Sequence, residues 1–335
     1  MFEIKHTLCP SCSVGCGINV ILDNGEVVGT FPFKRHPINE GKNCLNGRSS
    51  TDIMKNKLTF DSKLLDDVVE KLKSCNKDKV TVVFSGSNSN EDLEVIKGLC
   101  DAQGFNILAY ADNLKNFDSV VTYDDVEKAE KIFIIGNILY ENALLGRRIV
   151  HAKKNGAKIF VNDTLENTPT ANIADEFTST SVKEFLEANK LNIDDNSIII
   201  FNKVDFFEDL DVIEATFSKL LPVYSKSNTK GALNIVDAIS KEDALELLNN
   251  TEVLLNFNDD IINDFDFDFK SIPQVITFAV AENDTTRISD IAIPIKSWLE
   301  TDGTFTNAEG LTQDFMAVCE SDNMSIGEII NRLNG

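Results

Sequence analysis

The chain has 335 residues, of which 42% are hydrophobic and 26% charged, a composition typical of globular proteins rather than disordered or fibrous ones. Its formal net charge of −22 at pH 7 gives a pI near 4.5, and so acidic a surface repels nucleic-acid phosphates and anionic lipids. We therefore expect no nucleic-acid partner and interpret the charge as a source of solubility.

The sequence shows no apolar targeting segment, and no uninterrupted apolar run approaches the roughly 18 residues of a membrane span. We therefore expect a cytoplasmic protein without a membrane span. The cytosol keeps thiols reduced, so seven cysteines, four of them clustered, indicate metal ligation rather than a disulfide framework. The scattered Cys75, Cys100 and Cys319 are interpreted as small buried or idle thiols.

Residues 1–57 are expected to form a small β-rich domain of their own. Apolar and polar residues alternate over 18–29, on both sides of Asn24 and Gly25. This dipeptide favours a hairpin turn because both of its residues tolerate positive φ. We predict a β-hairpin centred on it.

The four clustered cysteines of this domain are candidate metal ligands, with the spacing Cys9-x2-Cys12-x3-Cys16-x27-Cys44. A four-thiolate zinc site is one reading, but zinc ribbons usually present two separate C-x2-C turns. Three thiols in one loop and a distant fourth favour a [4Fe-4S] cluster, although zinc stays open on spacing alone. Small residues let the backbone approach such a cluster and donate hydrogen bonds to its sulfurs: Ser11, Ser13, Gly15 and Gly17.

From residue 58 onward, helical patterns alternate with short apolar runs, as in parallel α/β sheets covered on both faces. We expect two α/β lobes with largely parallel sheets, at 58–190 and 191–335. The expected helices include 64–75, 91–104, 141–156 and 212–221, and the expected strands include 80–86, 105–111, 131–137, 157–163, 196–202, 252–258, 273–283 and 290–300. The acid–Phe alternation at 263–269 is interpreted as an exposed edge or loop with one apolar face.

The motif CPSCSVGCGINV at 9–20, followed by CLNGR at 44–48, resembles the iron-sulfur domain of the molybdopterin oxidoreductase family. The similarity continues at 80–92, at 131–163 and at 288–313, where GTFTNAEG is its most specific part. The sequence is similar to formate dehydrogenase catalytic subunits and to the large iron-sulfur subunit of NADH-quinone oxidoreductase. The resemblance implies a fold that surrounds a molybdenum or tungsten bis-pterin, with a [4Fe-4S] cluster on Cys9, Cys12, Cys16 and Cys44 as the electron relay.

Four departures from the family pattern concern the pterin centre. The stretch 104–113, where family enzymes carry a metal ligand, has no thiol and only the hydroxyl of Tyr110, while Cys100 lies on the preceding helix. Asn46 stands where the family has a lysine, and Thr164-Leu165-Glu166 and Leu311 stand where it has arginines. Finally, the sequence ends about 20 residues after 303–313, where catalytic family members continue into a C-terminal domain that closes over the pterin, so we expect that domain to be missing. Together these departures predict an intact cluster and a lost pterin site.

We therefore expect an electron-transfer subunit that works with other redox subunits of an oxidoreductase, and we assign no catalytic residue. A catalytic molybdenum or tungsten subunit, related to formate dehydrogenase or formylmethanofuran dehydrogenase, is the first alternative. A zinc-bound interaction module is the second.

Other polar residues are given structural roles. His6 is expected at the surface or beside the cluster, and His36 and His151 form no readable pair with a nucleophile. No phosphate-binding glycine motif is present. The paired acids Asp124-Asp125 and Asp259-Asp260 are expected to be solvated loop charges.

Overall fold

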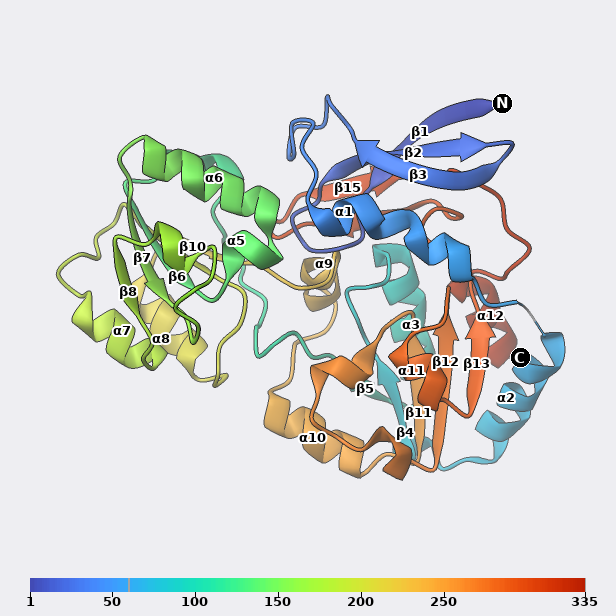
Figure 1. Ribbon diagram of the computed structural model, residues 1–335. Helices are drawn as coiled ribbons and strands as arrows, with labels where there is room; N and C mark the ends of the chain where they lie inside the picture. Colours follow the sequence, from blue (N-terminus) through green and yellow to red (C-terminus); the bar gives the residue numbers. More distant parts are fainter. Residues whose placement is uncertain (60, 335) are drawn as a thin grey trace.

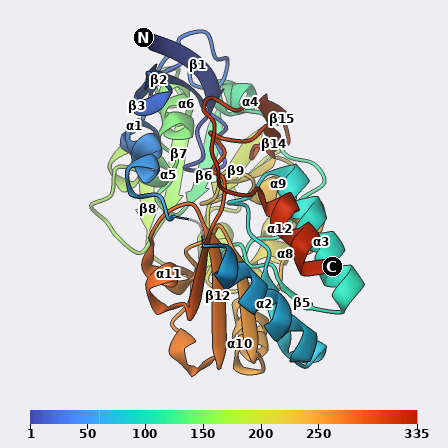
Figure 2. The ribbon, with the colours of Figure 1, turned by 90° about the vertical axis from the view of Figure 1, so that its right-hand side faces the viewer.

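The computed structural model describes residues 1–59 and 61–334. The molecule has two α/β lobes, each built on a parallel sheet of five strands, and a small antiparallel sheet near the N-terminus that lies above the right-hand lobe and beside the top of the left-hand lobe in Figure 1. The N-terminus lies at the end of the molecule that carries the small sheet, and the C-terminus lies at the end of the last helix, on the outside of one lobe (Figure 2). The expected fold class, a β-rich domain followed by two largely parallel α/β lobes, is confirmed.

The strands are β1 Phe2–Leu8, β2 Gly17–Asp23, β3 Glu26–Pro32, β4 Val80–Val83, β5 Asn106–Leu108, β6 Lys131–Ile135, β7 Lys158–Asn162, β8 Glu176–Thr178, β9 Ser197–Phe201, β10 Leu220–Pro222, β11 Val253–Phe257, β12 Gln274–Ala279, β13 Ile291–Pro294, β14 Gly303–Thr306 and β15 Thr312–Phe315. The helices are α1 Leu45–Ser49, α2 Ser62–Ser74, α3 Asn90–Gln103, α4 Tyr123–Lys128, α5 Ile138–Glu141, α6 Ala143–Lys154, α7 Val182–Ala188, α8 Asp209–Thr216, α9 Thr229–Leu233, α10 Lys241–Asn249, α11 Asp284–Ile288 and α12 Ile326–Asn334.

The predicted hairpin is the β2–β3 turn. Asn24 and Gly25 have φ values of 53° and 87°, as a turn with two left-handed residues requires. β2 pairs antiparallel with both β1 and β3, so the three strands form one sheet. Its buried face carries Ile18, Val20 and Leu22, at alternate positions of β2.

The two large sheets have the strand orders β13-β12-β11-β4-β5 and β10-β9-β6-β7-β8. Each draws strands from both 58–190 and 191–335, so the two expected lobes do not each correspond to one sheet. The reason is topological: the chain leaves the first sheet after β5, completes the second sheet and returns with β11 beside β4. Periodicity identifies strands but not the order in which they pair. The expected helix at 212–221 is α8, which ends at Thr216, and the last two residues of that range begin strand β10 beside β9.

The cores explain how the lobes are layered. One face of the β6–β10 sheet packs on α4 and α6, and this core is continuous with the N-terminal sheet through Ile18 and Val20. The opposite face packs Phe133 and Phe201 against α7 and α8. In the other lobe, α2, α3 and α12 cover one face of the sheet and α10 covers the other. The N-terminal domain therefore shares a core with the β6–β10 lobe.

The hairpin β14–β15 lies against the N-terminal sheet, with β15 beside β1 (Figure 1). Residues nearly 300 positions apart in the sequence therefore meet beside the four cysteines. Across residues 1–59 and 61–334, the structure has no helix of the length and apolarity that crossing a membrane requires.

Candidate metal centre

The four predicted cysteines line one small pocket. Cys9, Cys12 and Cys16 come from the turn between β1 and β2, and Cys44 immediately precedes α1. Ser11, Val14, Asn43, Ala143 and Leu144 complete the lining. About 300 Å³ inside this pocket is not occupied by protein atoms. The fold thus brings together all four residues that the sequence singled out.

The cysteine loop has a fixed backbone conformation. The Cys9 amide donates a hydrogen bond to the Cys16 carbonyl at 2.8 Å, which closes the loop. Gly15 has a φ of 79°, and a Cβ there would lie 2.2 Å from Gln313 Oε1 and 2.9 Å from Asn307 Cβ. A Cβ at Gly17 would lie 2.4 Å from the His36 ring. Both glycines are required by close contacts, and Gly15 also by its left-handed backbone.

The fourth thiol is placed by a helix end. Cys44 is the N-cap residue of α1, and the Gly47 amide donates to Cys44 Sγ at 3.3 Å. Hydrogen bonds from backbone amides orient a ligating sulfur and tune the metal centre that it holds.

Burial controls the protonation of the other three thiols. It raises the pKa of Cys9, raises the pKa of Cys12 to about 12 and raises the pKa of Cys16 well above its ordinary value. The neighbouring thiols add to the rise at Cys12 and Cys16, because thiolates repel one another. Metal binding would displace these protons and balance the crowded negative charge. The donor set therefore fits a cationic iron-sulfur group.

The spacing of the thiols bears on the choice between one ion and a cluster. Among the described residues, no three Cys, His, Asp or Glu side chains lie close enough together to hold a single metal ion. The four thiols line one shared pocket.

Segments far away in the sequence hold the cysteine loop in place, and sequence reasoning missed them. The Ala308 amide donates to the Ser13 carbonyl at 2.8 Å, and Gln313 Nε2 donates to the Gly15 carbonyl at 3.1 Å. Ser13 Oγ accepts from the Tyr224 amide at 2.8 Å. Of these residues, Ala308 belongs to the GTFTNAEG motif at 303–310. The motif alone does not indicate which part of the chain it contacts.

Two further contacts complete this clamp. The Tyr123 hydroxyl donates to the Val14 carbonyl at 3.1 Å, and burial raises the pKa of Tyr123 well above its usual value, so the hydroxyl keeps its proton. Trp298 Nε1 donates to the Leu8 carbonyl at 3.1 Å, immediately before Cys9. Both aromatic residues restrain the loop without entering the thiol pocket.

The scattered cysteines lie away from the pocket. Cys100 is buried in α3 within the core of the β4–β5 lobe, and burial raises its pKa to about 12. Cys75 and Cys319 are half-buried and face the carbonyls of Leu72 and Leu299. All three are unpaired thiols among the described residues.

The histidines have the structural roles expected of them. His6 stacks on Phe33 with ring centroids 4.1 Å apart and contacts Asn19 through Nδ1. His151 Nδ1 lies 2.9 Å from Glu127. The His36 ring packs beside the cysteine loop, and burial lowers its pKa, so the ring is neutral at pH 7.

The crevice between the two large sheets is where a pterin would be expected, because ligands of parallel α/β sheets bind at the carboxyl ends of strands. Here side chains bond to one another across it. Asn228 Nδ2, after β10, donates to the Asn88 carbonyl, after β4, at 2.9 Å. Asn88 is held in turn by its own sheet, because its Nδ2 donates to the Phe257 carbonyl at 2.9 Å. Gly86 packs directly on Thr229, where a Cβ would lie 2.3 Å from the Thr229 nitrogen.

A buried ion-pair cluster fills more of this crevice. Lys226 Nζ lies 2.6 Å from Asp259 Oδ2 and 2.7 Å from Asp264 Oδ2. Burial alone would lower the pKa of Lys226, but the two carboxylates outweigh it and raise that pKa. Burial raises the pKa of Asp264 to about 6, against the opposing effect of Lys226. The prediction that Asp259 is a solvated loop charge is therefore wrong: it is buried because it pairs with a lysine 33 residues away in the sequence.

The remaining space does not fit a bis-pterin. The cavity between Tyr110, Asp112 and Lys226 has a volume of about 10 Å³, whereas pockets that hold drug-sized ligands have volumes of roughly 300–1,000 Å³. Tyr110, the sole hydroxyl of the expected ligand segment, faces this pocket, and burial raises its pKa above its usual value. A protonated phenol is a poor metal ligand.

The other departures lie on the surface. Asn46 is exposed beside the thiol pocket, and 164–166 is an exposed segment after β7. Leu311 is also exposed, on the turn between β14 and β15. None of them directs a cation into the crevice.

The fold and site define a four-cysteine domain of the iron-sulfur kind joined to two parallel α/β lobes. Comparison with protein families matches residues 2–56 to the molybdopterin oxidoreductase Fe4S4 domain and residues 62–326 to molybdopterin oxidoreductase. The chain therefore belongs to the molybdopterin oxidoreductase family.

Curated relatives include formate dehydrogenases. The chain is 33% identical over 203 residues to the F420-dependent formate dehydrogenase 1 subunit alpha of Methanococcus maripaludis, covering 52% of this chain and 30% of that protein. It is 24% identical over 211 residues to formate dehydrogenase H of Escherichia coli, covering 50% of this chain and 29% of that protein. The chain thus spans about a third of the length of these relatives.

Two solved structures share the fold. Acetylene hydratase from Pelobacter acetylenicus aligns with a TM-score of 0.63 and 12% identity over 98% of this chain and 69% of that chain. A chain of the formyltransferase/hydrolase complex from Methylorubrum extorquens aligns with a TM-score of 0.54 and 10% identity, over 81% of this chain and 94% of that chain. At these identities the likeness establishes the fold alone.

Proposed function

We propose that this chain is the [4Fe-4S] electron-transfer subunit of a cytoplasmic oxidoreductase assembly, with Cys9, Cys12, Cys16 and Cys44 as the cluster ligands. The observation that carries the proposal is the convergence of these four thiols on one pocket within a matched Fe4S4 domain. The closed crevice between the sheets supports a role in electron relay rather than in pterin chemistry.

The work of the protein is to hold and tune the centre. When bound, a [4Fe-4S] cluster supplies one-electron oxidation and reduction. Three of the ligands come from a loop whose backbone is fixed by Gly15 and the clamp, so their positions are rigid. The Gly47 amide places a positive dipole on Cys44 sulfur, and burial of Cys9 and Cys16 keeps water away. Hydrogen bonds and burial are the means by which a protein sets such a potential.

A partner is part of the proposal. A relay without a substrate site needs another redox centre to receive its electrons, and two curated relatives are named as alpha subunits of formate dehydrogenases. The proposed partners are therefore redox subunits of the same assembly.

A catalytic molybdenum or tungsten subunit is the second candidate, and family membership is the observation that favours it. Metal analysis of anaerobically purified protein separates the two. We expect about four iron atoms per chain with neither molybdenum, tungsten nor pterin. Stoichiometric molybdenum or tungsten with extractable pterin would establish the second candidate, and zinc in place of iron would establish a structural module.

A pair of cysteine variants tests the ligand set. Cys12→Ala removes one corner thiolate, so we expect loss of iron and of the visible absorbance that bleaches on reduction. Cys100→Ala is the matched control, because it removes an equally unpaired thiol from the core of the other lobe. Equal iron content in the two variants would contradict the assignment.

A further inference from the structure

Charge is distributed unevenly along the chain. Residues 1–57 carry seven Lys and Arg against five Asp and Glu, whereas the whole chain carries 32 against 54. The candidate cluster domain is therefore the basic part of a strongly acidic molecule.

Four cations of this domain are exposed and free of ion pairs. Lys55 and Lys57 pair with Asp52 and Glu300, and Lys5 donates to a carbonyl. The described part of the chain offers no ion-pair partner to the other four, which we call the basic rim: Lys34, Arg35, Lys42 and Arg48. Leu45 lies within residues 34–48, the stretch that contains these four cations, and its side chain is 80% exposed. An exposed apolar side chain among unpaired cations is typical of a protein-docking surface.

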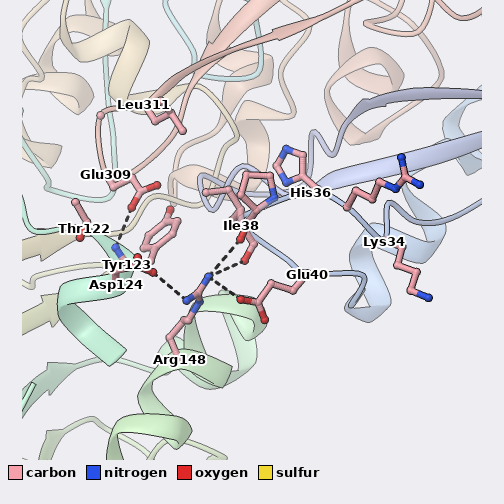
Figure 3. A pocket seen from close by; sticks show the side chains of 13 residues that line it. Lys34, His36, Ile38, Glu40, Thr122, Tyr123, Asp124, Arg148, Glu309 and Leu311 are labelled. Carbon is pink, nitrogen blue, oxygen red and sulfur yellow. Dashed lines mark hydrogen bonds and ion pairs between the residues drawn. The ribbon is translucent and has the colours of Figure 1, made fainter. Parts of the chain in front are cut away.

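Two residues of the basic rim, Lys34 and Arg35, line a groove of about 880 Å³, and Figure 3 shows Lys34 at its edge. Lys34 and Arg35 form one side of it, Tyr123 and Arg148 the floor, and the turn at Leu311 the other side. Arg148 is neutralised by Glu127 at 2.6 Å and Asp124 at 3.1 Å. Two further carboxylates line the groove: Glu40 pairs with Arg147 at 2.8 Å, and Glu309 accepts from the Tyr123 amide at 2.8 Å. Lys34 and Arg35 are the cations of this lining that have no ion pair among the described residues.

Two residues that line the groove contact the cysteine loop. Tyr123, on the groove floor, donates to the Val14 carbonyl at 3.1 Å. His36, also in the lining, packs its ring on Gly17, the residue after Cys16. A protein seated in the groove would therefore contact residues that pack directly on the cysteine loop.

We propose that the basic rim and this groove form the docking site for an acidic electron-transfer protein. This inference rests on the proposed function, because it needs a redox centre in the thiol pocket. In each encounter one electron leaves this chain's centre, which is oxidised by one electron, and the partner's iron-sulfur centre is reduced by one electron; no covalent bond forms or breaks. Attraction between the basic rim and partner carboxylates orients the encounter and raises its rate.

The test uses a bacterial-type acidic ferredoxin as the probe. The anaerobically reduced protein is mixed with oxidised ferredoxin in a stopped-flow spectrometer at several salt concentrations, and complex formation is measured by calorimetry. For the wild type, the second-order rate constant and the affinity should fall as salt rises, because salt screens the attraction. Lys34→Glu/Arg35→Glu should lower the low-salt rate constant by about tenfold or more and weaken binding.

The matched control is Lys63→Glu/Lys71→Glu, which makes the same change of charge on α2, in the β4–β5 lobe (Figure 1). Apart from the effect of the altered net charge, which both double variants share, this control should change the rate constant by less than about twofold. Reduction by the small cationic dye methyl viologen and the iron content should remain intact in both variants. Equal effects of the two double variants, or a rate that rises with salt, would overturn the proposal.

Two outcomes separate this inference from the function on which it rests. Protein that contains no iron refutes the proposed function. Protein that contains the cluster but reacts with ferredoxin independently of Lys34 and Arg35 leaves the function standing and refutes the docking site. If low salt drives the chain into dimers that the rim variant abolishes, the groove instead binds the acidic body of a second copy, and the proposal is wrong.

Discussion

Gly15→Ala tests whether the cysteine loop depends on contact with the β14–β15 hairpin. An alanine at φ 79° costs about 1–2 kcal/mol, because its Cβ approaches the following carbonyl. The same Cβ would lie 2.2 Å from Gln313 Oε1 and 2.9 Å from Asn307 Cβ. The glutamine end can rotate away, but the asparagine Cβ is fixed by its backbone, so the overlap adds roughly 1–3 kcal/mol.

Gly25→Ala provides the control. Gly25 has a φ of 87°, and a Cβ there would meet nothing within 4 Å. It should therefore cost only the backbone term of about 1–2 kcal/mol. At about 2 °C per kcal/mol for a chain of this size, Gly15→Ala should unfold roughly 2–6 °C below Gly25→Ala.

Thermal unfolding followed by circular dichroism gives the midpoints, and iron analysis of the same samples gives cluster retention. We expect Gly15→Ala to bind less iron, because three of the proposed ligands lie on the displaced loop. Identical midpoints and iron contents for the two variants would refute the conclusion that contact with Asn307 shapes this loop.

Three further changes test the buried polar groups. Lys226→Met should destabilise the protein by about 3–5 kcal/mol at pH 8, because Asp259 and Asp264 lose their cation. The loss of stability caused by Lys226→Met should be smaller at pH 5. Burial raises the pKa of Asp264 to about 6, so its carboxyl becomes neutral as the pH falls through that value and no longer needs the cation. An equal shift of the thermal unfolding midpoint at both pH values would contradict this. Tyr123→Phe should cost about 1–3 kcal/mol, measured by thermal unfolding, with iron content unchanged, because it leaves the Val14 carbonyl without its donor. Gln313→Ala should lower the melting midpoint by a similar amount, since the Gly15 carbonyl then lacks its hydrogen bond.

The sequence predicts most local elements and the ligand set. The alternation around Asn24 and Gly25 is sufficient for the hairpin, because turn chemistry and strand periodicity agree there. Helix α3 ends at Gln103, with the predicted Gly104 in the left-handed conformation. The spacing of the four cysteines singles them out, and the structure brings them to one pocket.

What the sequence could not predict depends on contacts between distant segments. The pairing of β11 with β4 follows an excursion through the whole second sheet, and no local pattern records it. Asp259 looks like an ordinary loop acid until Lys226 is placed beside it. The contacts of Ala308 and Gln313 with the cysteine loop likewise join residues nearly 300 positions apart.

Those long-range contacts impose an order on biogenesis. The cysteine loop leaves the ribosome first, yet its backbone is restrained by Trp298, Ala308 and Gln313, which are synthesised near the end of the described chain. A nascent chain shorter than about 313 residues lacks part of the restraint on the ligands. Cluster insertion into a correctly shaped site is therefore a late event, coupled to completion of the α/β lobes rather than to emergence of the cysteines.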